Sequence, residues 1–343
     1  MLDPGQGRLN LAPLCDILED PGGGLDLAQV SSPAWAERFR PHIGQEVDIG
    51  HSTSAWWLRF RLLPPSPPDG APRPTPAWWL EIGKPGLDFI DLHIPTARGW
   101  VTKQSGAMRG PEAREVLHRT YVLDLPDDFI SDGYCYLRVA SNISLNFPLQ
   151  LWRPDVYVAW TVADFFAFGV AYGVMLAMIV FNLFLYLSLR HRSYLLYIIY
   201  ITSMLIHLSL LYGQAPAFLN LGHGLSLTLS WITVSIAWLS AGAFSRGFLE
   251  TKRYSPKLDK CILLAMLVNI FLASPALHFA ISVIGVIVFV GLTAYDTQQI
   301  KEMYYEGDGE EIAAKKSIMG ALRLYLDFIN IFIMLMQLFG ERK

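Results

Sequence analysis

The chain has 343 residues, which is room for two domains of ordinary size. Its residues are 52% hydrophobic and only 17% charged, which is more apolar than is usual for a soluble protein. The net charge of -3 is close to neutral and gives no reason to expect a nucleic-acid partner. The apolar residues are concentrated after Trp160, whereas residues 1–158 hold most of the prolines and a normal share of charges.

The first residues, MLDPGQGRLNLAPL, lack the basic start and apolar stretch of a signal peptide. The domain that follows nevertheless has the character of an exported domain. Either a membrane helix inserts it without a cleaved signal, or the true start lies upstream. We favour the upstream start.

Residues 1–157 are expected to form an all-β extracytoplasmic domain, a sandwich or jelly roll. Short aromatic and β-branched segments alternate here with Pro, Gly and Asp, as in the breaker run Pro64–Gly70. In the first segment Trp57, Arg59 and Arg61 share one face and Trp56 shares the other with Leu58, Phe60 and Leu62. The expected strands are Trp56–Leu62, Trp78–Ile82, Phe89–Ile94, Tyr121–Leu125, Tyr134–Val139 and Leu145–Leu151.

The two tryptophan pairs and one arginine are the candidate ligand-binding residues of this domain: Trp56, Trp57, Arg59, Trp78 and Trp79. An indole face stacks well on a sugar ring, and jelly rolls bind sugars or small molecules through exposed aromatics and arginines. The alternative, which we favour for each single residue, is that one Trp of each pair is core and the other lies under a loop. Arg59 and Arg61 are then expected on a solvated sheet face.

Three cysteines show no metal-ligand spacing, and no cofactor or metal is expected. Cys15 and Cys135 could form a disulfide in an oxidising compartment, but we favour two unrelated buried thiols.

From Trp160 onward the sequence predicts a bundle of about six membrane helices, because each apolar run approaches or exceeds the ~20 residues that cross a bilayer. The fourth run is short. The expected spans are Tyr157–Leu189, Tyr194–Tyr212, Leu225–Phe244, Leu258–Leu272, Leu277–Tyr295 and Ile318–Phe339.

Lysine and arginine are concentrated in alternate loops, after the first, third and fifth spans. Residues 213–224 and 273–278 contain neither. The positive-inside rule therefore places the basic loops in the cytoplasm and the N-terminal domain outside. Asp164, near the outer start of the first span, is expected at the membrane interface, and His207 is expected to be a satisfied polar group.

The segments WWLRFRL, WWLEIGKPGLDFIDLHIP, YLRVASNISLNFPLQLW and FGVAYGVMLAMIVFNLFLYLSLRHRSYLLYIIY resemble bacterial seven-transmembrane receptors with diverse intracellular signalling modules. The resemblance covers about residues 1–260. It implies a periplasmic, carbohydrate-binding-like jelly roll on receptor-type helices (158–262) in the bacterial inner membrane. Such helices pass a signal to a cytoplasmic output domain, which does not follow here.

Residues 263–343 instead resemble the last two helices of the Bax-inhibitor family, through the segments AYDTQ and YLDFIN. Asp296 and Asp327 match a paired-aspartate, pH-sensitive calcium gate of that family, and carboxylates in apolar helices mark ion or proton paths by default. The alternative for Asp327 is a local pair with Arg323, four residues earlier on the same helix face. The chain therefore reads as a chimera, either a gene fusion or an assembly error.

The leading hypothesis is a membrane receptor that senses a small ligand, such as a carbohydrate, and that rearranges its helices towards a cytoplasmic partner. The second is a calcium leak gated by Asp296 and Asp327, and the third is a chimera without function. No catalytic triad or phosphate loop is present in the sequence, so we expect no enzymatic activity.

Overall fold

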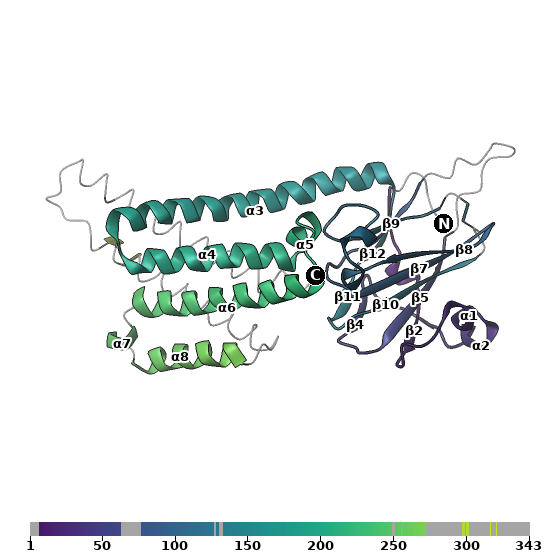
Figure 1. Cartoon of the computed structure of the whole chain (residues 1–343), viewed down its shortest axis with the longest axis horizontal. Helices are drawn as coiled ribbons and strands as arrows, with labels where there is room; N and C mark the ends of the chain where they lie inside the picture. Colours follow the sequence, from purple (N-terminus) through teal and green to yellow (C-terminus); the bar gives the residue numbers. More distant parts are fainter. Residues whose placement is uncertain are drawn as a thin grey trace. The chain divides into compact units, whose positions relative to one another are not determined.

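The computed structural model describes residues 7–62, 77–126, 128–129, 133–248, 251–254 and 256–271, with single positions 297, 298, 300, 301, 316 and 320. The chain divides into two compact units, Met1–Ala241 and Gly242–Lys343. The first unit contains an all-β domain and the first membrane helices, as the sequence predicts (Figure 1).

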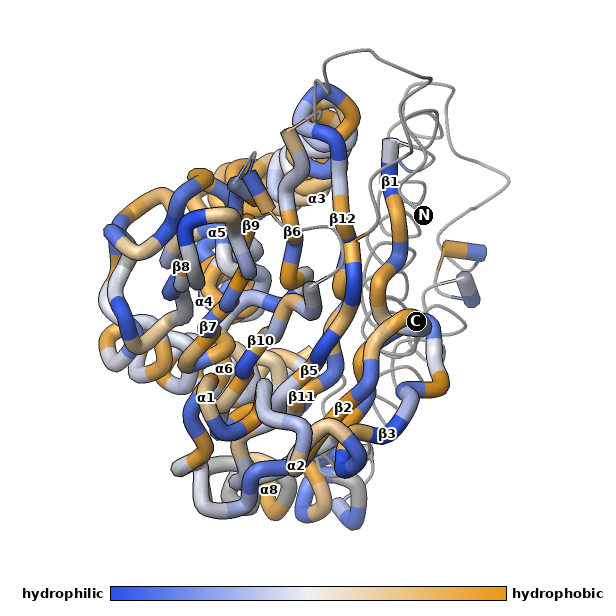
Figure 2. The backbone as a smooth tube through the Cα atoms, turned by 90° about the vertical axis from the view of Figure 1, so that its right-hand side faces the viewer, coloured by the Kyte–Doolittle hydropathy of each residue, from blue (hydrophilic) through white to orange (hydrophobic). Residues whose placement is uncertain are grey.

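The all-β domain consists of antiparallel strands in two main sheets. One sheet has the order β1-β12-β6-β9 and the other β3-β2-β5-β10-β7-β8 (Figure 2). Strands β11 and β4 pair separately. The strands are β1 (Arg8–Asn10), β2 (Asp16–Asp20), β3 (Arg40–Pro41), β4 (Val47–Gly50), β5 (Ala55–Arg61), β6 (Trp79–Ile82), β7 (Phe89–Thr96), β8 (Gly99–Ser105), β9 (Tyr121–Asp124), β10 (Tyr134–Ala140), β11 (Leu145–Phe147) and β12 (Leu149–Trp152).

The core lies between the two main sheets, which therefore form a sandwich. Leu58 and Phe60 of β5 enter this core from the six-stranded sheet, and Leu80 and Ile82 of β6 enter it from the four-stranded sheet. Because side chains alternate along a strand, Trp57 and Arg59 point to the opposite face of β5. The face assignment made from the sequence is confirmed.

The segment predicted as one strand over Leu145–Leu151 is two strands. Proline has no backbone N–H to donate, and Pro148 stands between β11 and β12. The strands on either side have different partners, since β11 pairs with β4 whereas β12 pairs with β1 and β6.

Two short helices, α1 (Leu27–Val30) and α2 (Pro33–Ala36), follow β2. A second apolar cluster joins this region to the outer face of the six-stranded sheet, with Val30, Phe39, Trp57 and Tyr136 among its buried members. Three single-turn 3-10 helices lie at Ala12–Leu14, Ala107–Arg109 and Pro111–Ala113.

Three of the described helices are long and apolar enough to cross a membrane: α3 (Pro154–Leu189), α4 (Arg192–Leu211) and α6 (His223–Phe248). They correspond to the first three predicted spans, and α5 (Gln214–Phe218) lies in the connection between α4 and α6. At 36 residues, α3 is about 54 Å long, whereas the hydrocarbon core is ~30 Å thick. Its first turns therefore extend outside the bilayer.

The second unit contains the end of α6, α7 (Thr251–Tyr254) and α8 (Pro256–Phe271), which coincides with the fourth predicted span. Arg246 donates two hydrogen bonds to the Asp259 carboxylate, at 2.8 and 3.2 Å, and the Thr251 hydroxyl donates a third at 2.7 Å. This ion pair ties the beginning of α8 to the end of α6. The fifth predicted span and, apart from position 320, the sixth lie outside the described residues.

Candidate functional site

The outer face of the four-stranded sheet is covered by the first turns of α3. Alternation places Trp79 and Glu81 of β6, Val122 of β9 and Trp152 of β12 on this face, away from the core between the sheets. Tyr157 of α3 packs edge-on against Trp79 and Trp152, with ring centres 5.7 and 5.6 Å apart. We call this contact region the junction.

Glu81 is the buried charge of the junction, with 4% of its surface exposed. The Thr120 hydroxyl donates to one carboxylate oxygen and the Trp152 indole N–H donates to the other, each at 2.9 Å. Burial raises the pKa of Glu81 above its ordinary value, although both hydrogen bonds oppose the rise. A buried carboxyl is costly unless it is bonded, so Glu81 fixes Trp152 and Thr120 in place.

His118 lies next to Glu81 and shares Thr120 with it. Its Nδ1 is 2.8 Å from the Thr120 hydroxyl oxygen, and the ring packs against Tyr157 and Phe165 of α3. Burial first of all, together with the neighbouring Arg119 and Arg114, lowers the pKa of His118 to about 4, and Asp164 opposes the shift. The ring is therefore neutral at neutral pH and can pack among aromatic side chains.

An ion pair joins the sandwich to α3 at the junction. Arg119 donates from Nε and Nη2 to the two carboxylate oxygens of Asp164, at 2.8 and 2.9 Å. The side chains are 15% and 13% exposed, so solvent screens the pair weakly. Asp164 was predicted to be interfacial; the structure shows that it is the helix side of this contact.

The connection between α4 and α5 also touches the sandwich. Gly213 has a φ of +81°, and a Cβ there would lie 2.6 Å from Pro85 Cβ and 2.8 Å from the Arg119 carbonyl oxygen. Only glycine allows this backbone conformation and this approach without strain. His223, the first residue of α6, adds a contact with Asp88, since its Nε2 is 3.4 Å from the carboxylate.

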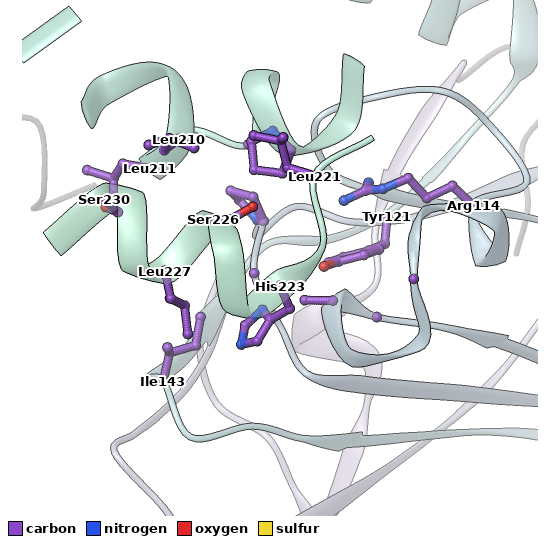
Figure 3. A pocket seen from close by; sticks show the side chains of 17 residues that line it. Arg114, Tyr121, Ile143, Leu210, Leu211, Leu221, His223, Ser226, Leu227 and Ser230 are labelled. Carbon is purple, nitrogen blue, oxygen red and sulfur yellow. The ribbon is translucent and has the colours of Figure 1, made fainter. Parts of the chain in front are cut away.

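A cavity of about 160 Å³ lies beside these contacts (Figure 3). The sandwich contributes Arg114 and Tyr121 to its lining, and α4 and α6 contribute Leu210, His223 and Leu227. Arg114 is held by hydrogen bonds to the carbonyl oxygens of His118 and Thr120, at 2.9 and 3.0 Å. The Tyr121 hydroxyl is buried and makes no hydrogen bond of normal geometry with the described residues.

The predicted ligand-binding tryptophans lie apart from this cavity. Trp57 and Trp78 are buried, with 1% and 3% exposure, in the two apolar clusters, where a ligand has no access to their rings. Trp79 belongs to the junction, and Trp56 is partly buried with its indole N–H donating to Ser52. The role of these residues in binding a ligand stays a prediction, which the burial of Trp57 and Trp78 disfavours.

Arg59 is not on a solvated face, so that expectation is wrong. Its side chain is 12% exposed, donates to Asp16 and to the Ala36 carbonyl at 2.9 Å each, and lies over the ring of Phe39. The residues 27–36 that follow β2 cover this part of the sheet. Cys15 and Cys135 are both free and buried in the main core.

Of the polar residues predicted in the membrane part, His207 is satisfied by Ser230 of α6, with its Nδ1 3.1 Å from the hydroxyl oxygen. Asp296 and Asp327 lie outside the described residues. Among the described residues, no group of three or more His, Cys, Asp or Glu is arranged to hold a metal ion.

The sequence reasoning did not single out Glu81, His118, Arg119 or Tyr121. One signal was available, because Glu81 alternates with Leu80 and Ile82 and so had to lie on the face opposite the core. The partners of Glu81 come from strands and loops far apart in the sequence and could not be read from this pattern.

Fold and junction together define a membrane protein with an outer all-β domain packed on its first membrane helix. Family models agree with this class. Residues 12–153 match the 7TMR-DISM extracellular 2 model, 164–295 the 7TM diverse intracellular signalling model, and 257–343 the Bax1-I model, inhibitor of apoptosis-promoting Bax1. The composition predicted from the sequence is confirmed: receptor-type outer and membrane modules, followed by a Bax-inhibitor-type segment. The last two models overlap over 257–295, a range that includes the predicted boundary at 262.

Curated relatives match over part of their length. The inner membrane protein YbhL of Escherichia coli is 57% identical over 84 residues, which is 24% of this chain and 36% of the relative. An uncharacterized protein of Rickettsia prowazekii is 54% identical over 82 residues, 24% of this chain and 35% of the relative. The chain thus spans about a third of the length of these two relatives.

Proposed function

We propose that this chain is a membrane receptor whose outer sandwich senses a small ligand and passes the change to the membrane helices through the junction. The observation that carries the proposal is the ion pair of Arg119 with Asp164 of α3, beside the hydrogen bond of Trp152 to Glu81 that holds the sheet face under the helix. Both contacts are buried and charged or charge-assisted, so they hold their geometry more firmly than surface contacts do.

The covalent connection supports the same proposal. Only Arg153 separates β12 from α3, and α3 then continues without interruption for 36 residues. A displacement of the four-stranded sheet is therefore carried directly into the first span, because no flexible loop lies between them to absorb it. Contacts of Gly213 and His223 extend the coupling to α4, α5 and α6.

The proposal places the chain in a bacterial inner membrane with the sandwich in the periplasm. The match to receptor modules and the positive-inside pattern support this placement, and a partial relative is named an inner membrane protein. The ligand is a small molecule or carbohydrate, and the helices act on a cytoplasmic signalling partner. No catalytic step is assigned to this chain.

The test uses the full chain in lipid nanodiscs, titrated with a panel of glycans while hydrogen exchange is followed in the sandwich and in α3 beyond Asp164. A receptor responds in both places to the same compound. Replacing Arg119 by Gln removes the response of α3 and keeps that of the sandwich. The matched control is Arg98→Gln, since Arg98 is 92% exposed and 3.9 Å from Asp128. An α3 response that persists unchanged in Arg119→Gln would contradict the proposal.

A second candidate function rests on the Bax1-I match over 257–343, which contains Asp296 and Asp327. Under it the chain is a pH-sensitive calcium leak in which the two aspartates share the gate. Calcium flux into liposomes then falls in Asp327→Asn, and an unchanged flux rejects this function. If the two halves were joined only by an assembly error, the source DNA would show a break across codons 255–275.

A further inference from the structure

We propose that the cavity between the sandwich and the outer ends of α4 and α6 is the binding site for a small amphipathic carboxylic acid. The inference rests on the proposed receptor function and names its ligand class. The evidence is an unpaired buried donor, a fixed positive charge and an apolar floor in one cavity (Figure 3).

The unpaired donor is the Tyr121 hydroxyl. The residue is 1% exposed and its hydroxyl points into the cavity. The Gly86 backbone N–H and the Arg114 guanidinium approach the hydroxyl oxygen as donors, so among the described residues its own proton has no acceptor. Buried polar atoms are nearly always paired, because leaving one unpaired is costly. Burial also raises the pKa of Tyr121, so the hydroxyl keeps its proton and needs an acceptor. A ligand oxygen in the cavity would satisfy it.

The positive charge of Arg114, next to the Tyr121 hydroxyl, indicates that this acceptor is an anion. The Arg114 guanidinium lies 4.5 Å from the centre of the Tyr121 ring, and two backbone carbonyls fix its position. The other ionisable group of the lining is His223, which lies against the Asp88 carboxylate. The Asp88 carboxylate therefore contacts the His223 imidazole and accepts a hydrogen bond from the Asn142 backbone N–H at 2.8 Å.

The apolar wall of the cavity, opposite Arg114 and Tyr121, indicates the size and polarity of the uncharged part of the ligand. Leu210 and Leu227 of the helices and Ile143 of the sandwich line it, and Ser226 and Ser230 of α6 lie beside them (Figure 3). A volume of about 160 Å³ suits a body of one benzene ring, since cavities of about 150 Å³ hold benzene. The two serine hydroxyls already have partners, the Gly222 carbonyl oxygen for Ser226 and His207 Nδ1 for Ser230, each at 3.1 Å, so they offer a sugar ring little hydrogen bonding.

Benzoate has the required charge and size and is the probe for the test. It is titrated against the full chain in nanodiscs and followed by ligand-observed proton NMR, with empty nanodiscs as the blank. We expect saturable binding of benzoate, weaker binding of benzyl alcohol, and none of glucose. Tyr121→Phe removes one hydrogen bond to a charged group and weakens benzoate binding about tenfold to a hundredfold.

Tyr134→Phe is the matched control, because Tyr134 packs on the outer face of the six-stranded sheet, outside the cavity. Ser226→Phe fills the cavity from α6 and abolishes binding without touching the sandwich core. The proposal is overturned if benzoate does not bind, or if it binds Tyr121→Phe and Ser226→Phe as tightly as the unaltered chain. Benzoate binding without a change in exchange along α3 beyond Asp164 would reject the receptor function alone. A glycan response in α3 without benzoate binding would reject this site alone.

Discussion

Glu81 and His118 are two buried ionisable side chains that share one partner, the Thr120 hydroxyl. Their pKa shifts are opposite in direction. Burial raises the pKa of Glu81 above 4.5, so its contribution to stability is present below that value and is lost as pH rises through the raised pKa. The pKa of His118 falls from 6.5 to about 4, so its contribution is present above 6.5 and is lost as pH falls towards 4. The two contributions offset one another.

Replacing each residue should therefore change the pH dependence of stability in opposite directions. When pH is lowered from about 7.5 to about 5, His118→Gln should lose less thermal stability than the unaltered chain, and Glu81→Gln should lose more. Thermal unfolding of the sandwich in nanodiscs at the two pH values measures both. His51→Gln, at an exposed histidine, is the control. Parallel pH profiles for all four proteins would show that neither group is linked to folding.

At the scale of elements, the described residues show the sandwich in contact with α3, with the α4–α5 connection and with His223 of α6, and not only joined through the chain between β12 and α3. The first turns of α3 cover the four-stranded sheet, and the α4–α5 connection touches the Pro85 loop at Gly213. A steric contact of this kind tolerates no side chain. The second contact therefore depends on one glycine.

Gly213→Ala should destabilise the first unit through both backbone strain and the clash with Pro85. Gly50→Ala is a matched control, because Gly50 has a φ of +79° and nothing within 4 Å of its added Cβ. A non-glycine residue in this conformation costs about 1–2 kcal/mol, which both variants incur. Only Gly213→Ala should also speed hydrogen exchange over residues 210–218. Equal effects of the two substitutions would mean that the contact adds nothing.

Over the whole molecule, local patterns predicted the elements with regular repeats. Alternation found β5, β6, β7, β9 and β10, and long apolar runs found α3, α4 and α6. The short or polar strands β1–β4 and β8 lack such a pattern and were not predicted. The junction could not be predicted, because it depends on pairings across long separations: 39 residues from Glu81 to Thr120 and 45 from Arg119 to Asp164.

The central claim is that the sandwich and the first membrane helix are energetically coupled through the junction. A double-mutant cycle measures it directly, with Arg119→Gln, Asp164→Asn and both together, by urea unfolding of the sandwich in nanodiscs followed by tryptophan fluorescence. We predict a coupling free energy of about 1–3 kcal/mol, as for other buried charged pairs. The same cycle on the exposed pair Arg98–Asp128 should give about 0–1 kcal/mol. Additive effects of Arg119→Gln and Asp164→Asn would contradict the claim.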